Sequence, residues 1–299
     1  MIINDRLAAW LESPSARKAT AEAMAELSAR IASIPAFAAL GRELAAAAAA
    51  GSDAVLALAG AFIGDDGAIQ AVIDASLAAA ARDPLCRPPL RASRNEVQDG
   101  LLLFSHPLLV VQLAVMGADA LAIKRGSDVD APPIAFTGQR MLFRFLKGGN
   151  AVLSIWEAPM IGSGFTAKAG ARCRLRERRR LADGDSIAFD GRRESFVVER
   201  AESDLVYIFA STSLDSSPVA TEYDPDSLEL IATSSTDDAS SRIQMMLALL
   251  RTMGRSDAAP LFAARLDAPH FHARWQAMRE FLALDAELAL PHLRRMAGS

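Results

Sequence analysis

Apolar residues recur at helical spacing near both ends of the chain, but not in its middle. In residues 68–81 the apolar positions fall on one helical face, which marks that face as buried. Ser52-Asp53 and Asp285 are residue types that begin helices, and they predict helices over 54–62 and 286–296. Three prolines within Asp83–Leu90 end the first helical region. The apolar positions on the buried face of residues 68–81 are Ile69, Val72, Ile73 and Leu77.

From about Leu101 the pattern changes to short apolar or alternating runs separated by Gly, Pro and Asp. The clearest example is Leu181–Glu199, where two Asp/Gly turns bracket apolar runs, as in a meander of antiparallel strands. Ala120–Lys124 is another predicted strand, and Leu108–Val115 suits either a strand or a buried helix. No helix-length gap interrupts these runs, so an antiparallel sheet is favoured over a parallel α/β sheet.

These patterns predict an α+β protein in three parts. Residues 1–97 form a helical N-terminal domain, residues 98–236 an antiparallel β-barrel or sandwich, and residues 237–299 a helical C-terminal domain. About 130 residues of strand and turn suffice for one complete barrel or jelly roll.

Composition narrows the class of protein. The 299 residues carry a net charge of −4, whereas nucleic-acid-binding proteins are typically basic. Cys86 and Cys173 are far apart and form neither a disulfide framework nor a zinc motif, so a reducing cytoplasm is expected. The N-terminus lacks the order of a signal peptide. The longest uncharged apolar stretch, Ala54–Ile63, is much shorter than the roughly 20 residues that span a bilayer. We therefore expect a soluble cytoplasmic protein without membrane contact.

The central region resembles a cupin-type β-barrel. The stretch Asp183–Gly191, with a Gly-Asp turn, a strand and a second turn, has the rhythm of that family. The resemblance implies a metal held by a His-x-His pair, a carboxylate and a later His. This chain has no such set, and the positions near Arg193, Glu194 and Ser195 carry no imidazole. The expectation is a metal-free, cupin-like barrel without a cofactor.

The C-terminal region is similar to a HEAT-type helical pair. Residues 274–285 fit the first helix and turn of such a repeat, and residues 289–297 fit the second helix. Repeat arrays usually need three or more units to share a core. Two generic helix hairpins beside the barrel explain the same pattern.

An unusual basic stretch provides the candidate binding residues. If the chain is extended from Arg172 to Arg178, every second residue is an arginine, and Arg192 on a later turn extends the patch. Guanidinium groups suit carboxylates and phosphates, so the patch predicts an anionic small molecule or an acidic protein surface as partner. The alternative is a solvated outer strand whose charges prevent edge pairing. Nucleic acid is disfavoured because no aromatic residues interleave with the arginines. The candidates are Arg172, Arg174, Arg176, Arg178 and Arg192, with Trp156 and Glu157 at a predicted barrel rim, where tryptophan lines a pocket or plugs the barrel.

No catalytic or metal-binding constellation stands out. His270 and His272 are two residues apart, and on a helix their side chains point too far apart to share a metal, although on an extended chain they could. Because Pro269 stands just before a predicted helix, a role at the helix N-terminus is favoured over metal binding. The leading hypothesis is therefore a non-enzymatic binding or regulatory protein. The alternative is a metal-independent enzyme for a small anionic substrate inside the barrel. An apolar barrel interior would favour binding, and converging carboxylates and arginines would favour catalysis. The enzyme would use Glu157 or Glu194 as general base and Arg144 or Arg174 to hold the substrate.

A contact between copies of the chain is also expected at the last predicted helix. Leu290 and Leu293 on this helix would be partly uncovered unless the barrel or a second subunit covers them. The simplest arrangement is a homodimer.

Overall fold

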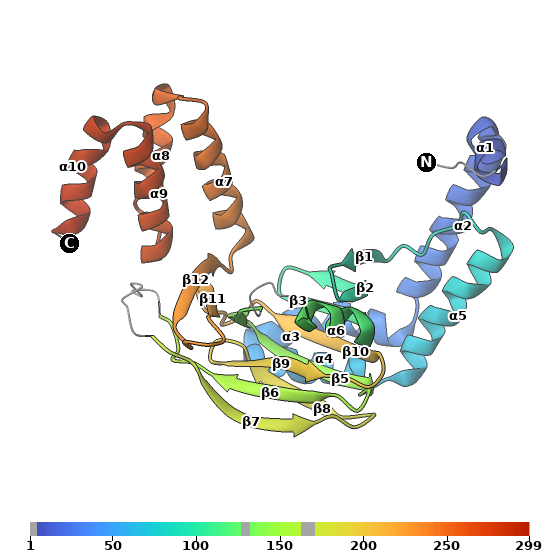
Figure 1. Cartoon of the computed structure of the whole chain (residues 1–299). Helices are drawn as coiled ribbons and strands as arrows, with labels where there is room; N and C mark the ends of the chain where they lie inside the picture. The colour runs from blue at the N-terminus through green and yellow to red at the C-terminus, as the bar shows by residue number, and fades with distance from the viewer. Residues whose placement is uncertain (1–4, 127–131, 163–170, 299) are drawn as a thin grey trace.

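The computed structural model describes residues 5–126, 132–162 and 171–298. In the chain order of these residues, helices come first, antiparallel strands follow, and helices return at the end (Figure 1). The predicted α+β fold class is confirmed.

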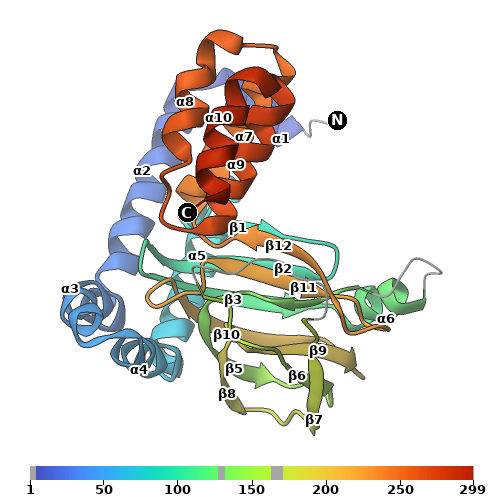
Figure 2. The same ribbon diagram turned by 90° about the vertical axis from the view of Figure 1, so that its left-hand side faces the viewer.

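The N-terminal helices precede the sheets in the chain, and α3 and α4 lie on one side of the six-stranded sheet (Figure 2). Ser13 begins α2 by accepting a hydrogen bond from the backbone N–H of Ala16, and Asp65 does the same for α5 through Ala68. Among the described residues, no single helix is both long enough and apolar enough to cross a membrane, but two bent pairs, α2–α3 and α4–α5, pass when each pair is taken together. The helices are α1 (Asp5–Glu12), α2 (Pro14–Ala32), α3 (Pro35–Ala50), α4 (Ser52–Ile63) and α5 (Asp66–Arg82).

The strands form three sheets in which all neighbours run antiparallel. The predicted Asp-Gly turn between β7 and β8 is present, and Gly184 adopts a φ of +85° there, a conformation that favours glycine. The six-stranded sheet has the order β1 (Arg91–Arg94), β2 (Gln98–His106), β3 (Leu109–Met116), β10 (Leu205–Thr212), β5 (Arg140–Lys147), β8 (Ser186–Asp190). The two three-stranded sheets are β12 (Leu230–Ser235), β11 (Val219–Tyr223), β4 (Ile134–Phe136), and β7 (Arg174–Arg180), β6 (Val152–Glu157), β9 (Glu194–Arg200).

The six-stranded sheet is covered on both faces. Figure 2 shows α3 and α4 on one side and the β7–β6–β9 sheet on the other. On the helix side, Ile208 and Ala210 of β10 join a core with Val55 and Phe62 of α4. On the other side, the strands share a second core with the β7–β6–β9 sheet. The six-stranded sheet and the β7–β6–β9 sheet, which enclose this second core, are called the barrel below. The members of the barrel core include Phe143, Phe145, Leu153, Ile155, Val198 and Tyr207.

Two local predictions were wrong. Ala120–Lys124 was expected to be a strand, but it lies in helix α6 (Ala118–Gly126). The carboxylate of Asp204, distant in sequence, accepts a hydrogen bond from the first backbone N–H of this helix, Ala118, at 2.9 Å, and thereby supplies the N-terminal cap. The second wrong prediction concerns strand β1, which lies within residues 1–97, the region predicted to be helical. The ambiguous segment at Leu108–Val115 is strand β3.

The C-terminal helices form a separate core on the far side of β12. Phe262 and Phe281 are almost fully buried between these helices, with ring centroids 5.6 Å apart. Asp285 caps the last helix through the backbone N–H of Leu288, as expected. The helices are α7 (Asp238–Thr252), a 3₁₀ turn (Ser256–Ala258), α8 (Ala259–Arg265), α9 (Phe271–Leu284) and α10 (Ala286–Ala297).

Candidate functional site

The arginine strand, β7 together with Arg172, lies at an outer edge of the β7–β6–β9 sheet. Four of the five candidate arginines lie here, and each of the four forms an ion pair with a glutamate of this chain. Most of these side chains are exposed, and such pairs stabilise a fold only weakly. The pairs are Arg172–Glu229 and Arg174–Glu157 and Arg176–Glu194, each at 2.6 Å, and Arg178–Glu199 at 2.7 Å.

The predicted alternation of these arginines is interrupted by a β-bulge. Ile155 lies opposite Glu177 and Trp156 lies opposite Leu175, so Arg176 has no residue directly across from it. The Arg176 guanidinium contacts Glu194 and, at 3.8 Å, also Glu157. These contacts raise the pKa of Arg176, with the hydrogen bond from its guanidinium to the adjacent Glu177 as the largest cause.

The remaining candidates do not gather into one basic patch. Arg192 turns to the carboxylate of Asp190, at 2.7 and 2.8 Å, and to the backbone carbonyl of Asp215. Trp156 packs against a small apolar cluster that includes Phe136 and Tyr223. Glu157 joins Arg172 and Arg174 around a surface hollow of about 420 Å³. Arg193 and Glu194 also line this hollow, which therefore contains both acidic and basic groups.

A second cavity lies inside the barrel, and it is markedly apolar. This barrel pocket has a volume of about 390 Å³, within the range of small-molecule sites. Phe143 lines it and contacts two further lining residues, Phe196 and Phe209, with ring centroids 5.0 and 5.4 Å away. Other described lining residues are Val97, Gln98, Met116, Leu121, Lys124, Pro132, Ala135, Thr137, Met141, Ser195, Val197, Val198 and Tyr207.

The main polar groups of the barrel pocket already have partners within the chain. The Tyr207 hydroxyl donates a hydrogen bond to the side-chain oxygen of Gln98 at 2.6 Å, and burial raises the pKa of this phenol. The Ser195 hydroxyl donates to the backbone carbonyl of Ala135. Lys124, the one charged residue of the described lining, forms an ion pair with Glu96 at 2.9 Å. An apolar ligand therefore fits this wall better than a charged one.

The barrel pocket does not fit a bound metal ion. Its described lining includes no His, Cys, Asp or Glu, the residue types that ligate most protein-bound metals. Within the described ranges of the chain, no three residues of these types come together in a suitable group. The metal implied by the cupin resemblance therefore has no ligands at this position.

The residues proposed for the enzymatic alternative lie outside the barrel pocket. Arg144 is on the opposite face of β5, where its guanidinium bonds the carboxylate of Asp66 at 2.6 and 3.0 Å. Glu157, Glu194 and Arg174 all belong to the surface hollow. The structure thus does not bring a general base and a substrate-holding arginine together inside the barrel.

The sequence analysis did not single out the aromatic residues of the barrel pocket. Phe143 and Phe145 alternate along β5, and Tyr207 and Phe209 alternate along β10. This two-residue spacing places each pair on one face of its strand. It was the sequence pattern from which a buried aromatic face could have been predicted. It indicates a buried face, but it does not distinguish a filled core from a core with a cavity.

Comparisons with known proteins give limited information. No protein-family model matches the chain, and no curated protein matches its sequence. Solved structures match part of it, including ectoine synthase from P. lautus, with 11% identity over 41% of this chain and 69% of that one and a TM-score of 0.26. The cupin domain of Schizosaccharomyces pombe Cnp3 has 11% identity over 40% of this chain and 64% of that one, with a TM-score of 0.25. A sugar phosphate isomerase of the cupin superfamily from Silicibacter pomeroyi has 13% identity over 50% of this chain and 87% of that one, with a TM-score of 0.26. At these scores, no ligand or activity is transferred to this chain.

Proposed function

We propose that this chain is a non-enzymatic binding protein whose barrel pocket holds a small, uncharged, largely aromatic or aliphatic molecule. The observation that carries this proposal is the wall of the pocket, in which Phe143, Phe196 and Phe209 surround a space of about 390 Å³. Aromatic rings stack on flat apolar ligands at little cost in conformational entropy. The hydrogen bond between Tyr207 and Gln98 engages two of the polar side chains in the lining.

Binding of a neutral fluorescent dye, N-phenyl-1-naphthylamine, tests this proposal. The dye gains fluorescence when it leaves water, and we expect saturable binding at one site per chain. Met116 and Val115 are neighbours on β3, but only Met116 lines the pocket, since successive side chains of a strand face opposite ways. Met116→Gln should weaken dye binding about tenfold, or about 1.4 kcal/mol, because the amide loses hydration beside the dye.

Val115→Gln is the matched control, because Val115 is 38% exposed and does not line the pocket. It should bind the dye as the unmodified protein does. Absence of saturable dye binding, or equal affinity in both variants, would contradict the proposed function.

The C-terminal helices are proposed as the surface for partner contacts, including the predicted homodimer. Leu293 packs within the helical core, but Leu290 is 40% exposed. Helix α7 exposes a broader apolar face at Met246, Leu249 and Met253, and exposed patches of this kind often mark interfaces. Sedimentation velocity over a range of concentrations tests the dimer. Leu249→Glu should abolish self-association. If the unmodified protein sediments as a monomer at all concentrations, the predicted homodimer is contradicted. The HEAT-like description of these helices remains a prediction.

A further inference from the structure

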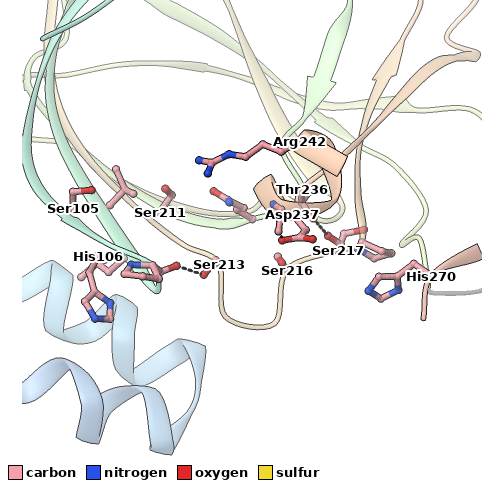
Figure 3. A pocket seen from close by; sticks show the side chains of 16 residues that line it. Ser105, His106, Ser211, Ser213, Ser216, Ser217, Thr236, Asp237, Arg242 and His270 are labelled. Atoms are coloured by element: carbon pink, nitrogen blue, oxygen red, sulfur yellow. Dashed lines mark hydrogen bonds between the residues drawn. The ribbon is translucent and has the colours of Figure 1, made fainter. Parts of the chain in front are cut away.

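A large polar cavity lies between the sheets and the C-terminal helices (Figure 3). This serine-lined cleft has a volume of about 770 Å³. One side comes from the turn between β2 and β3 and from the end of β10 with its following loop. The other side comes from the start of α7 and from His270 before α9. The cleft therefore joins segments that are far apart in the sequence.

Several hydrogen-bond donors that line the cleft have no partner among the described residues. The guanidinium of Arg242 extends over the cavity towards Ser211 (Figure 3), and it makes no ion pair or hydrogen bond with another described residue. The side chains of Ser105, Ser211 and Ser216 likewise have no described hydrogen-bond partner. Because each cavity-facing group must otherwise be hydrated, a ligand that accepts hydrogen bonds can replace that water.

Most of the other polar groups of the cleft are already engaged. Ser213 donates to the carbonyl of Pro107 at 2.7 Å, and Ser217 donates to the carbonyl of Ile161 at 3.3 Å. Asp237 is the one carboxylate of the described lining, and it caps α7 by accepting from the backbone N–H groups of Ala239 and Ser240. Hydrogen bonds from Ser240 hold the pKa of Asp237 below its usual value, so this group stays ionised and committed to the helix. The unengaged groups that line the cleft thus include the guanidinium of Arg242, the neutral hydroxyls and the buried Nδ1 of His270.

We propose that the serine-lined cleft binds a small organic anion, with its phosphate or carboxylate group on Arg242 and the hydroxyls of Ser211 and Ser216 as further donors. A guanidinium binds such groups through two parallel N–H···O bonds. The carbon skeleton of the ligand would lie against Leu109, Val110 and Pro218, the apolar part of the lining. This site is separate from the barrel pocket, because the two share no lining residue. Its ligand would also connect the sheets to the C-terminal helices.

Isothermal titration calorimetry on the full chain at low salt tests this proposal, with glycerol 3-phosphate and citrate as probes for the phosphate and carboxylate groups. At least one probe should bind with a Kd of about 1 mM or lower, and glycerol, which lacks the anionic group, should not bind. Arg242→Gln should weaken that binding at least about tenfold, since the charged fork is lost. Raising the salt concentration should weaken it as well, because salt screens the attraction between charges.

Arg279→Gln on α9 is the matched control, because Arg279 is an exposed arginine of the same group of helices and does not line the cleft. This variant should bind the probe as the unmodified protein does, and circular dichroism should show that both variants are folded. The proposal is overturned if neither probe binds, or if Arg242→Gln and Arg279→Gln bind with equal affinity. The stronger of the two probes identifies which anionic group the cleft prefers.

Discussion

Phe143 lies at the centre of the barrel's aromatic cluster, and its replacement by alanine provides a direct measure of how that cluster is packed. Its side chain is 6% exposed, and five aromatic rings have centroids 5.0 to 6.1 Å from it. Removing a buried phenyl group costs about 3–5 kcal/mol, through lost transfer free energy and the cavity left behind. Phe143 also borders the barrel pocket, so part of its surface lacks packed neighbours. We therefore expect Phe143→Ala to cost about 3 kcal/mol, the lower end of that range.

Urea unfolding followed by tryptophan fluorescence measures this loss in the barrel itself. The chain has three tryptophans, with Trp10 in α1, Trp156 in β6 and Trp275 in α9. A background with Trp10→Phe and Trp275→Phe leaves Trp156 as the reporter of the sheets. Phe143→Leu is the control and should cost less than about 1.5 kcal/mol, because most of the buried volume is retained. A loss below about 1 kcal/mol for Phe143→Ala would refute the packed cluster that we infer.

Three further predictions concern charged groups. Arg144→Met should lower the free energy of unfolding by about 1–2 kcal/mol in urea titrations, because the guanidinium, 19% exposed, bonds the carbonyl that ends α4 at 2.9 Å; an unchanged midpoint would contradict this role. The double variant Arg174→Gln/Arg176→Gln should change thermal stability by less than about 1 kcal/mol, because exposed ion pairs contribute little; if the sequence-based prediction of an acidic partner is right, binding to polyglutamate should also be lost. The hydrogen bond from Arg192 holds the pKa of Asp190 below its usual value, so its contribution to stability is present above about pH 4, the unfolded value, and is lost as the pH falls through the lower folded value. Between about pH 5 and about pH 2, roughly the range of that loss, the urea midpoint should therefore fall more steeply in the unmodified protein than in Asp190→Asn.

The sequence predicted the order of helical and sheet regions because that order depends on local patterns. The Asp-Gly turns around Ser186–Asp190 and the cap at Asp285 require only a few adjacent residues, and both are present in the structure. Helix α6 was missed because its N-terminal cap, Asp204, comes from a distant part of the chain. The bulge at Arg176 was missed because it depends on the register with β6, which no local pattern encodes.

The candidate sites were harder to predict because neither cavity has a sequence motif. The barrel pocket combines residues from Val97 to Phe209, and most are of types that ordinarily fill a core. The serine-lined cleft combines Ser105 with Arg242 and His270, and these residues meet only after the sheets and the C-terminal helices are in place. The arginine strand was conspicuous in sequence, but the charges of four of its arginines are matched by glutamates on β6, on β9 and on the loop before β12.

Strand β5 illustrates why alternation alone was insufficient. Its sequence alternates Arg140, Leu142 and Arg144 with Met141, Phe143 and Phe145, a pattern typical of a strand with one face in water. In the structure both faces are covered, because the N-terminal helices lie over the face that carries the arginines. The arginines are accommodated there by partners on the helices: Arg140 bonds Ser52 and Asp53 at the start of α4, and Arg144 bonds the carbonyl of Ile63 at its end. The two arginines thus fix both ends of α4 on the sheet whose other face forms the barrel pocket. An arginine can be buried when carboxylates and carbonyl groups accept its hydrogen bonds. Polar residues on one face of a strand therefore indicate a solvent-exposed face only when no helix supplies such acceptors.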